Sequence, residues 1–165
     1  MTKITFQGNP LNIAGSLPNI GSKAPNFDLV GDDLSSITLN SLKGKKVLLN
    51  IFASIDTPTC AIATKKFNDD AAKHSDLVVL CVSVDLPFAL ARFSQENNLS
   101  HIKNASAFRD KNFGKDYGVE IIDGPLKGIL SRAVVLIDAN GSVIYTEHVS
   151  ELADEPNYSA VLKKL

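Results

Sequence analysis

Among the 165 residues of this chain, two cysteines are the side chains best suited to redox or nucleophilic chemistry, and Cys60 has the more informative setting. It ends the stretch SIDTPTC (residues 54–60), which directly follows an apolar run. Thr57 has a side chain suited to capping a helix, and Pro58 suits the first helical position. Cys60 then falls in the first turn, where free backbone N–H groups and the positive helix end stabilise a thiolate.

A purely structural interpretation of Cys60 stands beside this one. A lone cysteine is more often a small buried hydrophobic residue than a nucleophile. Thr57 would then be only a cap and Pro58 only a helix start. A thioredoxin-type C-x-x-C motif is absent, because Ala63 occupies the place of its second cysteine, and dithiol exchange within this motif is therefore excluded. Cys81, in the middle of the strand-like VVLCVSV, is predicted to be a buried structural residue.

Arg132 is the next candidate, because it opens the apolar segment RAVVLID behind the loop-like DGPLKGILS. A guanidinium at a strand end can reach a site built at the same edge of the sheet. The alternative is a solvated arginine paired with a surface carboxylate.

Metal and phosphate chemistry find little support in the sequence. His74, His101 and His148 are scattered without the spacing of metal ligands, so we expect each at the surface. GPLKG is glycine-rich but does not match a phosphate-binding loop, and we expect it to line a pocket or a dimer contact.

Composition and charge indicate a globular protein without nucleic-acid or membrane partners. The chain is 44% hydrophobic and 21% charged, with a formal net charge of −1. Its length favours a single domain over residues 1–165. It has no apolar run long enough to span a bilayer, and its first ten residues lack the apolar core of a signal peptide. We therefore expect a cytoplasmic protein, in which free or redox-active cysteines are usual.

Apolar runs, periodicity and turn residues predict the elements that position these candidates. The expected strands are residues 3–6, 11–14, 26–30, 36–40, 46–54, 76–85 and the two arms of 132–149, and the expected helices are 57–73, 87–96, a short one within 106–119, and 157–165. The two arms flank Asn140-Gly141, which favours a tight hairpin. The order β-α-β-α, then hairpin, then α predicts an α/β thioredoxin-like fold, a central mixed sheet flanked by helices, with an N-terminal β-hairpin extension.

The chain resembles a peroxiredoxin, specifically the bacterial thiol peroxidase group of atypical two-cysteine enzymes. The resemblance runs end to end and is carried by FQGNP, NIFASIDTPTC, VDLPFALARF, FRDKNFGKDYGV, DGPLKG and RAVVLID. It implies that Cys60, three residues after Thr57, attacks the peroxide and that Arg132 assists. It also implies a thioredoxin-like fold, no metal or organic cofactor, thioredoxin as the reductant and a homodimer.

Two positions depart from the family pattern. Ala53 replaces a proline that helps to shield the thiolate from water, so we expect a looser pocket. Ser94, in ARFSQEN, stands where the group carries its resolving cysteine, and serine cannot form a disulfide. Ser94 marks either a natural one-cysteine variant or a Cys-to-Ser change made to trap a state; the near-isosteric exchange favours the second.

The predicted reaction is two-electron reduction of hydrogen peroxide or an alkyl or lipid hydroperoxide, which leaves a sulfenic acid on Cys60. Ionising a free cysteine, with a pKa of about 8.5, gains only roughly tenfold near neutral pH. The remaining rate must come from aligning the O–O bond and stabilising the departing oxygen, for which Thr57, Arg132 and the amides near Thr59 and Cys60 are candidates. The alternatives are a non-catalytic redox sensor or interaction module, which would oxidise once and bind a partner, and a structural thioredoxin-like domain with an inert Cys60.

Overall fold

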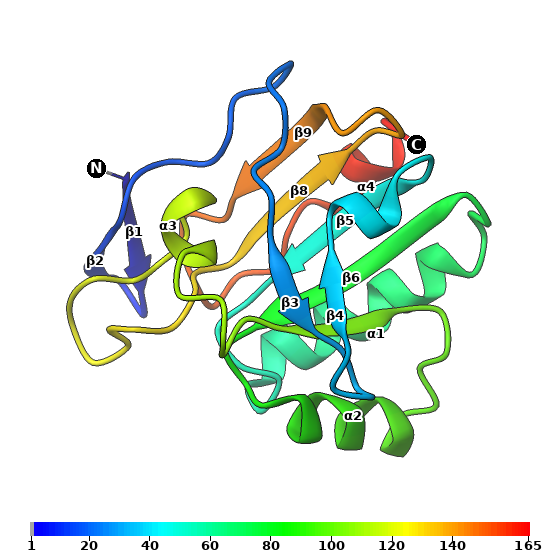
Figure 1. Ribbon diagram of the computed structural model, residues 1–165. Helices are drawn as coiled ribbons and strands as arrows, with labels where there is room; N and C mark the ends of the chain where they lie inside the picture. Colours follow the sequence, from blue (N-terminus) through cyan, green and yellow to red (C-terminus); the bar gives the residue numbers. More distant parts are fainter. Residues whose placement is uncertain (1) are drawn as a thin grey trace.

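A computed structural model describes residues 2–165 and shows a mixed seven-stranded sheet with a separate two-stranded hairpin, β1–β2, at one end (Figure 1). The strand order in the sheet is β4-β3-β7-β6-β5-β8-β9. The strands are β1 (Thr2–Phe6), β2 (Asn9–Ile13), β3 (Asp28–Val30), β4 (Ser36–Thr38), β5 (Lys46–Ile51), β6 (Leu77–Ser83), β7 (Lys103–Ser106), β8 (Ala133–Ile137) and β9 (Val143–His148). The helices are α1 (Pro58–Ala71), α2 (Pro87–Glu96), α3 (Phe113–Asp116) and α4 (Tyr158–Leu162), with a 3-10 turn, η1 (Asn40–Leu42).

The centre of the sheet follows the predicted β-α-β-α order and continues into β7. β5 pairs in parallel with β6, and β6 pairs in parallel with β7, so α1 and α2 are the crossover helices. β8 then pairs antiparallel with β5, and β9 antiparallel with β8. The predicted thioredoxin-like fold and the N-terminal hairpin are therefore confirmed.

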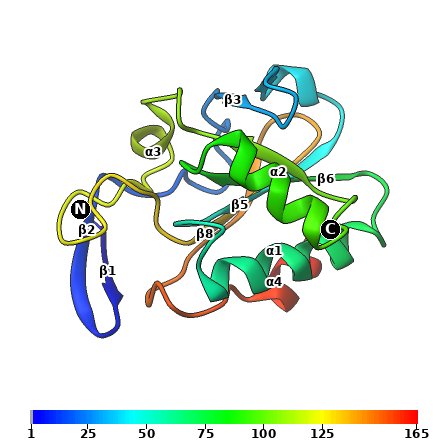
Figure 2. The same ribbon diagram turned by 90° about the horizontal axis from the view of Figure 1, so that it is seen from below.

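Alternating side chains of the central strands divide the core into two layers. On β5, Leu48 packs in a cluster with Phe67 of α1 and Leu90 of α2, whereas Leu49 packs with Phe113 of α3 on the opposite face. Figure 2 shows α1 and α4 together on one side of the sheet and α3 on the other. Cys60 and Cys81 both belong to the first layer.

Several boundaries differ from those predicted. The strand expected over 46–54 ends at Ile51, because residues 52–57 leave the sheet as the loop that leads into α1. Only the end of a strand is expected before the short helix within 106–119, but a full strand, β7, precedes it and connects the β3–β4 pair to the sheet. The predicted hairpin is present, with Gly141 at a left-handed φ of 86° and the Asp138 carboxylate accepting from the Asn140 and Ser142 amides.

Candidate active site

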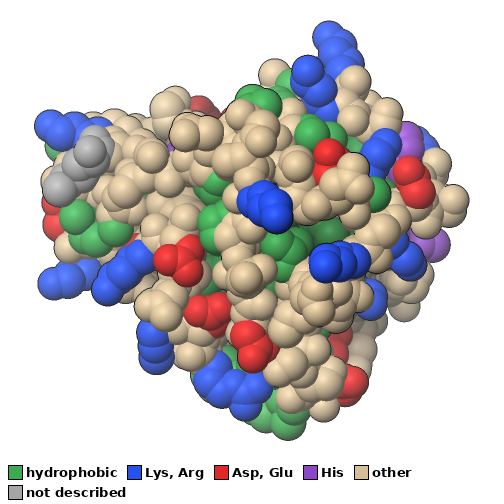
Figure 3. Space-filling view, turned by 45° about the horizontal axis from the view of Figure 1, so that its top comes forward, with side chains coloured by type: hydrophobic (Ala, Val, Ile, Leu, Met, Phe, Trp, Pro, Cys, Tyr) green, Lys and Arg blue, Asp and Glu red, His purple; other side chains and the backbone are tan. Residues whose placement is uncertain are grey.

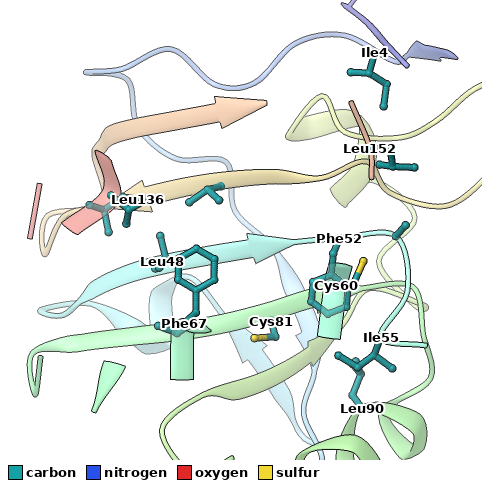
Figure 4. Close-up of a cluster of buried hydrophobic side chains, with 14 of the residues drawn as sticks. Ile4, Leu48, Phe52, Ile55, Cys60, Phe67, Cys81, Leu90, Leu136 and Leu152 are labelled. Atoms are coloured by element: carbon teal, nitrogen blue, oxygen red, sulfur yellow. The ribbon is translucent and has the colours of Figure 1, made fainter. Parts of the chain in front are cut away.

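Cys60 lies in the first turn of α1, as the Thr-Pro-Thr-Cys stretch predicts. The Ala61 amide donates to the Thr57 carbonyl at 3.1 Å, and this is the first hydrogen bond of the helix. The preceding amides, of Thr59 and Cys60, have no acceptor among the described residues, which is the usual state of first-turn N–H groups. The Cys60 side chain is buried, with an exposed fraction of 0%, and Figure 4 shows it beside the Phe52 ring.

Arg132 brings a positive charge directly to this sulfur. It precedes β8, whose first residue, Ala133, pairs with Ile51 at the end of β5, so Arg132 lies at the sheet edge where the Cys60 loop begins. Its Nη2 donates to Cys60 Sγ at 3.2 Å. Arg132 is only 2% exposed, so the solvated surface arginine is not what the structure contains.

The guanidinium is also held by the main chain. Both Nε and Nη2 of Arg132 donate to the Leu152 carbonyl oxygen, at 3.1 and 3.0 Å. The remaining nitrogen, Nη1, is buried and has no partner among the described residues. Buried donors are nearly always satisfied, so Nη1 offers a place for one more acceptor beside the sulfur.

The prediction that the Thr57 side chain caps the helix is wrong. Its backbone has the extended geometry of a helix cap, but its side chain makes no capping bond within the described chain. The hydroxyl instead donates to the Ser54 carbonyl at 2.8 Å, because the turn from Ser54 to Thr57 directs that carbonyl toward it. The Thr57 hydroxyl proton is therefore bonded to the Ser54 carbonyl and is not directed at Cys60.

The segment 150–153 is the part of the site that the sequence did not indicate. Leu152 contributes its carbonyl to Arg132, and Ala153 accepts a hydrogen bond from the Thr59 hydroxyl at 2.9 Å. Both contributions are backbone acceptors, which any residue type supplies. No residue pattern marks such a position in advance.

Ser94 is not brought to Cys60 by any hydrogen bond among the described residues. It lies on α2, is 9% exposed, and its hydroxyl accepts from Asn104 Nδ2 at 2.9 Å. Asn104 also donates to the Leu90 carbonyl at 3.2 Å, so Ser94 belongs to a polar contact between α2 and β7.

Cys81 is buried in β6, as predicted, and both cysteines are free. Burial raises the pKa of the Cys81 thiol to about 12, although Asn50 Nδ2 donates to its sulfur at 3.6 Å. The neutral thiol is thus the stable form of Cys81. In Figure 4 its sulfur lies apart from that of Cys60.

The histidines are only in part surface residues. His101 is exposed, but His148 is half-buried, and its Nε2 lies 2.6 Å from the buried Ser131 hydroxyl. Burial lowers the pKa of His148. The described residues hold no group of three or more histidine, cysteine or acidic side chains that could bind a metal ion.

Other features around Cys60 leave the sulfur closed. Ala53, where we expected a looser pocket, is 6% exposed and packs in the same cluster as Cys60.

A hollow of about 420 Å³ is lined instead by residues of the opposite sheet edge, among them Lys23, Leu42 and Val47. Figure 3 shows a hollow with a hydrophobic floor between basic side chains. None of the described helices is long and apolar enough to cross a membrane.

Comparison with known proteins shows the family to which this chain belongs. The Redoxin family model matches residues 19–162. Thiol peroxidase from Mycobacterium tuberculosis is 53% identical over 165 residues, covering 100% of this chain and 99% of the relative. Two solved structures superpose closely: a peroxiredoxin-like protein from Aquifex aeolicus (TM-score 0.93, 39% identity, covering 99% of this chain and 95% of that one) and a thiol peroxidase from Chromobacterium violaceum (TM-score 0.92, 28% identity, 99% and 95%). The chain belongs to the redoxin family and, within it, to the bacterial thiol peroxidases.

Proposed function

We propose that Cys60 is the sulfur at which this thiol peroxidase reduces hydroperoxides. The single observation that carries the assignment is the 3.2 Å contact between Arg132 Nη2 and Cys60 Sγ inside the protein. A buried guanidinium needs a compensating partner, and none of the ion pairs among the described residues includes Arg132. The thiolate form of Cys60 supplies that negative charge.

The chemistry follows from this pair. The Cys60 thiolate attacks the terminal peroxide oxygen; an S–O bond forms, the O–O bond breaks, and its electron pair leaves on the second oxygen. That oxygen takes a proton and departs as water or an alcohol, leaving a sulfenic acid on Cys60. Nη1 of Arg132 and the free amides of Thr59 and Cys60 are the donors available to stabilise the departing charge.

Access requires movement of the first turn of α1, because the sulfur has an exposed fraction of 0%. Helix starts and loops open locally at a small fraction of the free energy of global unfolding. With serine at position 94, the sulfenic acid is reduced by an outside thiol, and thioredoxin is the reductant that the family resemblance implies. The same resemblance implies a homodimer and catalysis without a cofactor.

The test is rapid mixing with hydrogen peroxide of the parent chain, Cys60→Ser and Cys81→Ser. We expect the rate of the Cys60→Ser variant to fall by about 10³-fold or more, since removing a nucleophile removes the covalent step. Cys81→Ser is the matched control, because it removes the other buried thiol and should retain the parent rate. A Cys60→Ser protein that reacts as fast as the parent would refute the assignment.

A further inference from the structure

Asp85 occupies the point where two parallel strands end beside each other. β5 ends at Ile51, β6 ends at Ser83, and Ile51 pairs with Val82. Because the carboxyl ends of adjacent parallel strands meet at one sheet edge, the residues that follow β6 face the loop that follows β5. Asp85 therefore faces the loop that carries the chain from the sheet to Cys60.

The Asp85 side chain is bonded to this loop at two points. Oδ1 accepts from the Ser54 hydroxyl at 2.8 Å, and Oδ2 accepts from the Ile55 amide at 2.8 Å. Oδ2 also accepts from the Ser83 hydroxyl, at 2.7 Å, at the end of β6. All three partners donate in this arrangement, and a carboxylate accepts from all of them; an asparagine would lose the charge of these bonds and would have to use the Ser54 hydroxyl as an acceptor.

Further hydrogen bonds link Ser54 to the start of α1. The Ser54 carbonyl accepts from both the amide and the hydroxyl of Thr57, at 3.1 and 2.8 Å. The Thr57 carbonyl in turn accepts the first hydrogen bond of the helix that contains Cys60. A short chain of hydrogen bonds thus runs from Asp85 through Ser54 and Thr57 to the turn that bears the sulfur.

Asp85 is itself fixed to the sheet. Its amide donates to the Ser83 hydroxyl at 3.2 Å, and its carbonyl accepts from the Ser106 hydroxyl at the end of β7. Asp85 is therefore bonded to the ends of β6 and β7 as well as to the loop that it holds.

We propose that Asp85 is a positioning residue that holds the 54–57 loop closed and so keeps Cys60 Sγ within hydrogen-bonding distance of Arg132. It touches neither the sulfur nor the guanidinium; it acts through Ser54 and Thr57. Peroxide enters through a brief opening of the first turn, but the attack takes place with the turn closed and Cys60 Sγ against Arg132. Releasing Asp85 lets the turn open more often and therefore shortens the time spent in this reactive geometry.

The near-isosteric Asp85→Asn variant tests this, with Asp138→Asn as the matched control. Asp138 also accepts hydrogen bonds from loop amides, but at the opposite edge of the sheet. For each protein we would measure the rate of Cys60 oxidation by hydrogen peroxide and, separately, the alkylation rates of Cys60 and Cys81 by a bulky uncharged maleimide. Both thiols are fully buried, so alkylation of Cys60 reports local opening and alkylation of Cys81 reports wider unfolding.

We expect Asp85→Asn to lower the peroxide rate by roughly ten- to a hundredfold, the cost of a small misplacement of reacting groups. Alkylation of Cys60 should rise several-fold in the same protein, whereas Cys81 and the Asp138→Asn control should keep their parent rates. An unchanged peroxide rate would overturn the proposal. So would equal acceleration at both cysteines, which is what a merely structural role predicts.

Ser54→Ala supplies a second route if Asp85→Asn fails to fold. It removes one Asp85 contact and should shift both Cys60 rates in the same directions, by smaller factors; unchanged rates would contradict the proposal. The peroxide arm rests on the proposed function of Cys60, but the alkylation arm does not. If the parent fails to react with peroxide, the proposed function fails, and the alkylation of Cys60 still decides whether Asp85 holds the loop.

Discussion

At the scale of single residues, the two cysteines of this chain have opposite environments although both are buried. Cys60 receives a hydrogen bond from a guanidinium, whereas Cys81 receives only a weak one from the Asn50 amide. Burial raises the pKa of the Cys81 thiol to about 12, so charge on that sulfur is disfavoured. The two cysteines therefore differ in the side chain next to the sulfur and not in burial.

The raised pKa of Cys81 predicts a loss of stability in alkaline solution. The native thiol keeps its proton to about pH 12, whereas in the unfolded chain it ionises near the ordinary value of 9.0. Ionisation therefore favours the unfolded chain, and the stability contribution of Cys81 falls as the pH rises from about 9 to about 12.

Urea unfolding of the parent and of Cys81→Ala from about pH 8 to about pH 11 measures this effect. We expect the free energy of unfolding to fall more steeply with pH in the parent than in Cys81→Ala. Lysine and tyrosine residues titrate in both proteins, so the difference isolates Cys81. Parallel curves would show that Cys81 does not titrate as the buried environment requires.

The two side chains that meet at the candidate site could be predicted from the sequence, whereas the groups that hold the surrounding chain could not. Cys60 and Arg132 could be selected because a thiol after Thr-Pro-Thr and a guanidinium at a strand end have recognisable settings. Leu152 could not, because its contribution is a backbone oxygen. Asp85 could not, because its contacts depend on how far the loops after two neighbouring strands extend, which residue types do not specify.

At the scale of elements, the N-terminal hairpin clamps the segment that holds Arg132. The Thr5 amide donates to the Ser150 carbonyl, and the Leu152 amide donates to the Thr5 carbonyl, both at 2.8 Å. Glu151 adds its carboxylate, which accepts from the Thr5 hydroxyl and from the Gln7 amide at 2.8 Å. The hairpin itself was predicted from its turn; its docking on residues 150–152 joins distant parts of the chain and was not.

This clamp predicts a loss of stability in acid. The hydrogen bond from the Thr5 hydroxyl, followed by those from the Gln7 and Gly8 amides, lowers the pKa of Glu151 to about 2 from an ordinary 4.5. The stabilisation from Glu151 is therefore complete above about pH 4.5 and is lost as the pH falls toward about 2.

Glu151→Gln should lower the urea midpoint at neutral pH, and its difference from the parent should shrink between about pH 4.5 and about pH 2. Asp154→Asn is the control, since Asp154 is exposed and lies three residues after Glu151. A deficit that stays constant over this range would mean that the Glu151 charge is not what fastens the hairpin.

At the scale of the whole molecule, the oxidation product depends on which thiols can come close enough to form a disulfide. Cys60 is on α1 and position 94 is on α2, while Cys81 is held inside β6. After one equivalent of hydrogen peroxide we expect the parent to gain one oxygen and to lose no hydrogens. Ser94→Cys should instead lose two hydrogens as a disulfide forms, which requires both helix regions to open, since neither position is exposed.

Mass spectrometry of the parent, Ser94→Cys and the double variant Cys60→Ser/Ser94→Cys measures these products. The double variant is the control and should not form the disulfide. Loss of two hydrogens in the parent would reveal a bond between Cys60 and Cys81 and would contradict the separation of the two thiols described above.

The carbonyl that anchors Arg132 has a consequence for how this site tolerates sequence drift. Because position 152 supplies only main chain to the guanidinium, exchanging its side chain for another apolar one leaves the anchor in place. An inserted or deleted residue nearby would carry the oxygen away whatever the side chains were. Related chains that keep this contact must therefore conserve the length of this segment more strictly than its residue types.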